Sequence, residues 1–125
     1  MPGKLSDEEK ASLENDAKAE QAAKEEVRRK EAELKEVDQM IERERKKQWE
    51  MQDDKTRISE NYRKGEIDQD QYARAWKDRD DIEVQSIKEE KDLQRERESK
   101  AREVEQAKQK AAEASRQYKE KEYNQ

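Results

Sequence analysis

The sequence has no cysteine, no histidine and no phenylalanine, and only one proline and two glycines among its 125 residues. Without cysteine, the chain forms no disulfide and offers no thiolate to a metal ion. Without histidine, it lacks the commonest metal ligand and the commonest acid–base catalyst. We therefore predict no catalytic residue, no cofactor, no metal site and no small-molecule substrate, and a protein that is not an enzyme.

Long apolar stretches are also missing, since 28% of the residues are hydrophobic and 52% are charged. So few apolar side chains can line a seam between helices but cannot fill a compact globule. No run approaches the roughly 20 residues needed to cross a bilayer, and the first residues lack a secretory signal pattern. We expect no membrane partner, and a location in the cytoplasm or in an assembly built there.

Low hydrophobicity is typical of disordered chains, but these usually also have high net charge and much Pro and Gly. Here 30 Lys and Arg nearly balance 35 Asp and Glu. The rest of the chain is rich in Gln and Ala, which share with Glu, Lys and Arg a high helix propensity. The composition therefore predicts an all-α protein rather than a disordered one.

A first helix is predicted to begin at a capping box. In this motif the Ser6 hydroxyl accepts from the Glu9 N–H, and the Glu9 side chain reaches back to the N–H of Ser6. No proline or glycine follows until Gly65. Gly65 suits the left-handed residue that closes a helix.

A second helix is predicted directly after this glycine. Asp68 is a good N-cap, Gln71 completes a second capping box, and Ile67 can pack on Tyr72 as a hydrophobic staple. We predict helices over about residues 6–64 and about 68–122, with a turn at about 65–67 inside the segment 64–68. The near-equal arms indicate an antiparallel, coiled-coil-like helical hairpin, a single elongated domain over residues 1–125.

The first arm contains an interrupted seam. Apolar residues alternate at spacings of three and four, as a coiled coil requires. The same register also contains polar residues, so we expect the hairpin to be completed by oligomerisation or by partner helices. The partner-contact candidates from the best stretch are Val27, Leu34, Val37 and Ile41. The polar positions are Asp16, Glu20, Lys30, Glu44, Gln48 and Lys55.

The second arm has its clearest apolar spacing at eleven residues. Ile82, Leu93 and Val104 follow it, and so do Trp76 and Ile87. Such a repeat predicts a straight or slightly right-handed stripe rather than the usual left-handed supercoil.

Trp49 falls one position off the seam of the first arm, and Trp76 lies off the face that Ile82 and Leu93 define in the second. An exposed Trp near the turn is typical of an anchor for a protein partner. The alternative is that both side chains cover the seam near the turn.

The dense basic clusters are Arg28-Arg29-Lys30 and the run from Arg43 to Lys47. Glutamates interleave both, which weakens the extended positive field that drives binding to nucleic acid. Ion pairs within the helix are the simpler role, so a nucleic-acid partner is not expected.

The segment Gly65–Tyr72 resembles the Gly-x-Ile-Thr/Ser/Asp-x-x-Glu/Gln-Phe/Tyr pattern of the short C-terminal domain family. It is also similar to helix reversals in bacteriophage tape-measure proteins and other coiled-coil virion proteins. The resemblance implies a role in oligomerisation or assembly in a phage or bacterial setting.

Three functions remain open from the sequence ahead of a nucleic-acid-binding rod, which is the fourth and least expected. The first is a structural or assembly protein that acts as a spacer, clamp or oligomeric subunit through helix packing. The second is a small adaptor or inhibitor that binds a protein through the hairpin tip. The third is a continuous single helix used as a stiff spacer, which the caps around Gly65 argue against.

Overall fold

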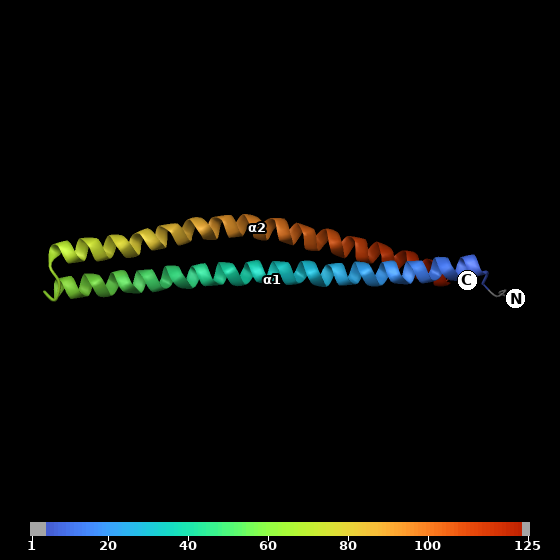
Figure 1. The fold of residues 1–125 in the computed structure, drawn as a ribbon, viewed down its shortest axis with the longest axis horizontal. Helices are drawn as coiled ribbons and strands as arrows, with labels where there is room; N and C mark the ends of the chain where they lie inside the picture. Colours follow the sequence, from blue (N-terminus) through green and yellow to red (C-terminus); the bar gives the residue numbers. More distant parts are fainter. Residues whose placement is uncertain (1–4, 124–125) are drawn as a thin grey trace. The chain divides into compact units, whose positions relative to one another are not determined.

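The computed structural model describes residues 5–123, and the protein is 94% helical with no strand in that range. Helix α1 spans Asp7–Arg63 and helix α2 spans Gln69–Tyr123 (Figure 1). The two helices pack against each other, which confirms the predicted all-α helical hairpin. The continuous single helix is wrong, because the chain leaves the helical path between Arg63 and Gln69.

The start of α1 has the hydrogen bonding of an N-cap. The Glu9 N–H donates to the Ser6 Oγ at 3.1 Å, and the Lys10 N–H donates to the Ser6 carbonyl at 3.0 Å. Asp7, Glu8 and Glu9 place negative charge in the first turn. There the unpaired N–H groups carry the positive end of the helix dipole, so these carboxylates stabilise the helix end.

Gly65 ends α1 with a φ of 77°. The Glu66 N–H donates to the Asn61 carbonyl at 2.9 Å, and the Gly65 N–H donates to the Tyr62 carbonyl at 3.0 Å. This is the Schellman pattern, which satisfies the last carbonyls of a helix and needs a residue in the left-handed region. Glycine adopts that conformation without strain from a Cβ atom.

The capping box of α2 follows at once. The Asp68 N–H donates to the Gln71 Oε1 at 2.9 Å, and the Gln71 N–H donates to the Asp68 Oδ1 at 2.8 Å. The Tyr72 ring stacks on Tyr62, with 4.6 Å between ring centroids, and Ile67 is half-buried in the turn. Tyr62 and Tyr72 are each five residues from Ile67, so the pairing is centred on Ile67 rather than on Gly65.

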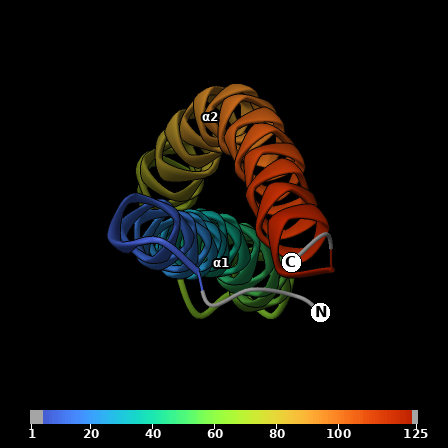
Figure 2. The same cartoon turned by 90° about the vertical axis from the view of Figure 1, so that its right-hand side faces the viewer.

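The chain divides into two compact units. The terminal unit comprises residues 1–35 and 98–125, and the turn unit comprises residues 36–97. In each unit α1 lies beside α2 (Figures 1 and 2). The most buried apolar side chains are Val104 and Ala107 in the terminal unit and Val37 and Ile41 in the turn unit.

The seam of α1 follows the predicted register. Polar and apolar members alike are buried or half-buried between residues 13 and 58. They are Leu13, Asp16, Glu20, Ala23, Val27, Lys30, Leu34, Val37, Ile41, Glu44, Gln48, Met51, Lys55 and Ile58. Tyr62, the next position in this register, is 41% exposed.

The seam of α2 differs from the predicted eleven-residue stripe. Leu93 and Val104 are half-buried and buried, but Ile82 and Ile87 are 39% and 40% exposed. The covered positions instead recur every three or four residues, so both helices present heptad-type faces to each other. They are Tyr72, Ala75, Arg79, Glu83, Ser86, Glu90, Leu93, Arg97, Lys100, Val104, Ala107, Ala111, Ala114 and Tyr118.

Candidate interaction surfaces

A hydrogen-bonded cluster around Ser86 replaces apolar packing in the middle of the turn unit. Ser86 is 1% exposed, and its hydroxyl donates to the Glu44 Oε2 at 2.6 Å. The Gln48 Nε2 donates to the Glu90 Oε1 at 3.1 Å. The hydrogen bond from Ser86, with further help from Lys47, lowers the pKa of the Glu44 carboxyl against the opposing effect of burial. Glu44 is therefore held as a carboxylate inside the seam.

Lys55 links the helices closer to the turn. Its ammonium lies 2.6 Å from the Glu83 Oε2 and 2.9 Å from the Asp80 Oδ1. Hydrogen bonds to Glu83 and Asp80 raise the pKa of Lys55, although burial opposes this. The same ammonium lies 4.7 Å from the centroid of the Trp76 ring, within range of a cation–π interaction. Trp76 thus covers a charged seam position and is 36% exposed.

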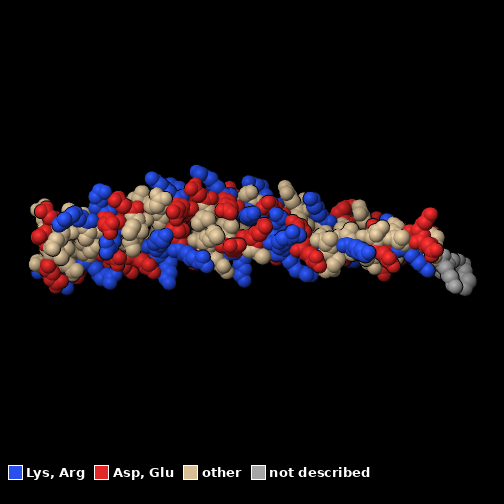
Figure 3. Space-filling view, viewed as in Figure 1, with Lys and Arg blue, Asp and Glu red and all other residues tan. Residues whose placement is uncertain are grey.

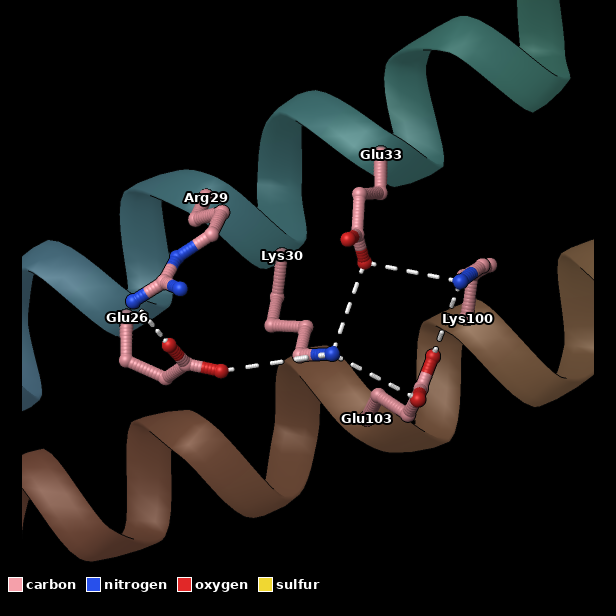
Figure 4. Close-up of polar contacts among 6 residues, drawn as sticks. All are labelled: Glu26, Arg29, Lys30, Glu33, Lys100 and Glu103. Carbon is pink, nitrogen blue, oxygen red and sulfur yellow. Dashed lines mark hydrogen bonds and ion pairs between the residues drawn. The ribbon is translucent and has the colours of Figure 1, made fainter.

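A network of charged side chains also links α1 to α2 in the terminal unit (Figure 4). Lys30 of α1 lies 3.5 Å from Glu103 of α2, and Lys100 of α2 lies 3.5 Å from Glu33 of α1. The charges of Glu103 and Glu33 raise the pKa of Lys100. Burial alone would raise the pKa of Glu33, but the charges of Lys100 and Lys30 lower it. Glu26 and Arg29 extend this network along α1.

All six polar interruptions of the α1 seam have a partner on α2. Besides Lys30, Glu44, Gln48 and Lys55, the Asp16 Oδ2 lies 2.7 Å from the Lys121 Nζ, and the Ser115 hydroxyl donates to the Glu20 Oε1 at 3.5 Å. Pairing offsets part of the cost of taking these groups out of water, whereas a covered group left without its partner would destabilise the hairpin. A one-residue slip would separate these pairs, so they favour one register of α1 against α2.

The stretch from Val27 to Ile41 is part of the hairpin's own seam. Val37 and Ile41 are each 4% exposed, and Val27 and Leu34 are half-buried. Their burial turns them toward α2, and Lys30, the one polar seam position between them, is paired with Glu103 of that helix. That these four residues also contact a partner stays a prediction.

Trp49 is the most exposed large hydrophobic residue of the described chain, at 68%. It lies one position beyond the seam residue Gln48, where a side chain points to the flank of α1. We call the depression beside it the Trp49 groove. This groove is lined by α1 alone, by Gln39, Glu42, Arg43, Arg45, Lys46 and Trp49.

Three apolar residues of α2 also remain in solvent. Ile82, Val84 and Ile87 are between 39% and 44% exposed. The eleven-residue prediction placed Ile82 in the covered stripe of α2, because it used apolar spacing alone. The signal that could have corrected it is the heptad spacing of Glu83, Ser86 and Glu90, opposite the polar positions of α1.

The two charge signs are mixed over the rest of the surface. The face in Figure 3 shows Lys and Arg among Asp and Glu along its length. Many are neighbours on one helix, such as Arg63 with Glu60 at 2.9 Å and Lys77 with Asp81 at 3.0 Å. Exposed pairs of this kind contribute little to stability, up to about 1 kcal/mol each. They leave no extended field of one sign on this face.

Comparisons with protein families, with curated proteins and with solved structures found no match to this sequence. The resemblance of residues 65–72 to the short C-terminal domain pattern therefore carries no family assignment. Within residues 5–123, no three acidic side chains gather to hold a metal ion. Neither α1 nor α2 contains a stretch apolar enough to cross a membrane.

Proposed function

We propose that this chain is a non-enzymatic structural or assembly protein. It is a charged helical hairpin that acts as a spacer, clamp or oligomeric subunit through helix–helix packing. The observation that supports this most strongly is the division of its apolar residues. Those in the α1 seam serve the hairpin itself, whereas Trp49 lies in solvent beside a groove. An exposed Trp with basic neighbours is typical of an interface anchor.

The self-contained seam gives the proposal its mechanism. Because the six polar positions of α1 are matched on α2, the hairpin needs no partner to satisfy them. A partner helix is then free to dock on the flanks, where association does not compete with folding. The charged flanks favour partners of complementary charge and disfavour others.

A second candidate is a small adaptor or inhibitor that binds through the hairpin tip. The observation that favours it is a groove beside the turn, lined in part by Lys55, Ser59, Arg63 and Trp76. Trp76 is only 36% exposed there and is partly covered by Lys55. The tip thus offers a weaker anchor than Trp49.

Site-specific photo-crosslinking separates the two candidates. The photoreactive residue benzoylphenylalanine replaces Trp49, or Glu66 in the turn, or as a control Glu105 on the exposed face of α2. Each full-length variant is irradiated alone and in a lysate of its source cells, after circular dichroism has verified its helicity. The assembly proposal expects a defined protein product from position 49, and the tip adaptor expects one from position 66. Products that are equal at all three positions, or absent from all, contradict both.

A further inference from the structure

A second groove lies on the turn unit, and its chemistry is complementary to that of the Trp49 groove. We call it the Ile82 groove. Its large apolar lining residue is Ile82, whose side chain is 39% exposed. It is lined by Lys47, Asp78, Asp81, Ile82, Gln85, Ser86 and Glu89.

The two grooves carry opposite charge. The Trp49 groove has three basic residues and one acidic residue, namely Arg43, Arg45, Lys46 and Glu42. The Ile82 groove has three acidic residues and one basic residue. Asp78 and Asp81 form ion pairs with Arg79 and Lys77, but these pairs are largely solvent-exposed, and exposed pairs are weak enough to be exchanged for a partner's cations.

The grooves lie at one level of the turn unit but on opposite flanks. Ser86, which lines the Ile82 groove, also hydrogen-bonds to Glu44 and Gln48, next to Trp49 in the chain. Lys47 belongs to the Ile82 groove and Trp49 to the other. Two residues correspond to about 200° around a helix axis, since a turn holds about 3.6 residues. One hairpin therefore presents a basic, aromatic surface on one flank and an acidic, aliphatic surface on the other.

From this arrangement we propose that copies of this chain associate side by side, with the Trp49 groove of one copy against the Ile82 groove of the next. The inference rests on the proposed function and names its partner as a second copy. The contact joins two different surfaces, so it is heterologous. Each added copy leaves one groove of each kind free, and the association continues unless it closes into a ring.

The test uses two full-length variants that each lose one apolar anchor. Trp49→Ala removes the anchor of the first groove, and Ile82→Ser removes that of the second. Loss of a central interface anchor weakens binding by about tenfold or more. Val84→Ser is the matched control, because Val84 is equally exposed on α2 but lines neither groove. Sedimentation velocity and light scattering give the mass over a range of concentrations, and circular dichroism verifies that each variant folds.

The wild type and Val84→Ser are expected to grow in mass with concentration, while Trp49→Ala and Ile82→Ser stay monomeric at the same concentrations. Mixed in equal amounts, the two monomeric variants are expected to form pairs and nothing larger. The intact Trp49 groove of one variant meets the intact Ile82 groove of the other, and no second intact pair of grooves remains. High salt is expected to weaken the wild-type association, since charge complementarity contributes to it.

Several results would overturn the inference. A wild type that stays monomeric throughout would do so, as would variants that associate as the wild type does. If Trp49→Ala loses association and Ile82→Ser keeps it, the Trp49 groove binds elsewhere. If Val84→Ser also loses association, the effect is not specific to the grooves. A crosslink from position 49 to a different protein would leave the proposed function standing and refute only the second copy as partner.

Discussion

At the scale of single residues, exposure separates the two tryptophans. Trp76 lies against the Lys55 ammonium, whereas Trp49 is 68% exposed beside the basic side chains of its own helix. A ring that covers a paired charge contributes to folding, and a ring in solvent does not. The two tryptophans therefore differ in role, since Trp76 contributes to folding and Trp49 is free to contact a partner.

We expect Trp76→Ala to lower the free energy of unfolding by about 0.5–2 kcal/mol, because it removes the cation–π contact and uncovers Lys55. Trp49→Ala is the matched comparison and should change it by no more than about 0.5 kcal/mol, as for other exposed positions. Urea unfolding followed by circular dichroism, at concentrations where the protein is monomeric, measures both. A larger loss from Trp49→Ala would place Trp49 in the hairpin core and contradict its role as a free anchor.

Ser86 shows how a small polar residue can serve as core. Its hydroxyl donates to the Glu44 carboxylate between the helices. We expect Ser86→Ala to lower the free energy of unfolding by about 1–3 kcal/mol, since the covered carboxylate loses its hydrogen-bond donor. Ser99→Ala, on the exposed face of the same helix, is the control and should have little effect.

The double variant Glu44→Leu/Ser86→Ala is a sharper test of the same pair. Replacing a covered polar pair by apolar residues is often neutral or stabilising, whereas removing one partner is not. The double variant should therefore recover most of the stability that Ser86→Ala loses. Equal loss in both variants would show that the loss in Ser86→Ala does not arise from a Glu44 carboxylate left without its donor.

At the scale of the elements, the turn was predictable because its signals are local. A glycine that ends one helix, followed after two residues by a capping box, needs no tertiary partner to be recognised. The structure has the Schellman bonds at Gly65 and reciprocal bonds between Asp68 and Gln71. The observed helix bounds accordingly lie within one residue of the predicted ones.

Gly65→Ala is expected to lower the free energy of unfolding by about 1–2 kcal/mol, because a residue with a Cβ atom is strained in the left-handed conformation. An added Cβ would meet no atom within 4 Å, so the cost arises from the backbone and not from a clash. Gly65→Asn should lose less, since Asn tolerates this conformation better. Thermal unfolding of the three proteins gives the order; equal stability of all three would mean that the turn does not require a positive φ.

The seams show the limit of prediction from apolar spacing. In α1 the apolar residues Val27, Leu34, Val37 and Ile41 mark the covered face, so polar positions that continue their spacing on either side could be assigned to the same register. In α2 the covered face between residues 79 and 100 is mostly polar, and Ile82 and Ile87 point outward. Apolar spacing therefore selected the wrong stripe in α2. The polar partners of α1 decide the α2 face, and a search of one helix for apolar residues does not find them.

At the scale of the whole molecule, charged side chains occupy many of the seam positions that apolar side chains fill in an ordinary coiled coil. With 52% charged residues, the chain covers Lys30, Glu44 and Lys55 and satisfies each across the hairpin. Because the seam contains charged residues, the free energy of unfolding depends on their ionisation. A covered carboxylate that accepts a hydrogen bond or pairs with a cation stabilises the fold only while it is charged. The pH dependence of unfolding therefore reports on the seam itself.

Acid is expected to weaken the hairpin through Glu44 and Glu33. The pKa of each in the folded chain lies below the ordinary value of 4.5. A carboxyl with a lowered folded pKa stabilises the native state at pH values above its unfolded pKa, and this contribution is lost as pH falls through the folded pKa. Near neutral pH both carboxyls stay ionised, so their contribution to the unfolding temperature of the wild type should change little there. The unfolding temperature should fall at pH below 4.5, where they become protonated.

Glu44→Gln tests this assignment, because a side chain without a titrating proton has no such contribution to lose. The variant should be less stable than the wild type at neutral pH, and its unfolding temperature should fall less between neutral pH and pH below 4.5. Glu50→Gln, an exposed substitution on the same helix, should follow the wild-type profile. If Glu44→Gln and Glu50→Gln give the same profile, acid sensitivity arises from the surface charges, and the hydrogen bond from Ser86 does not hold Glu44 ionised in solution.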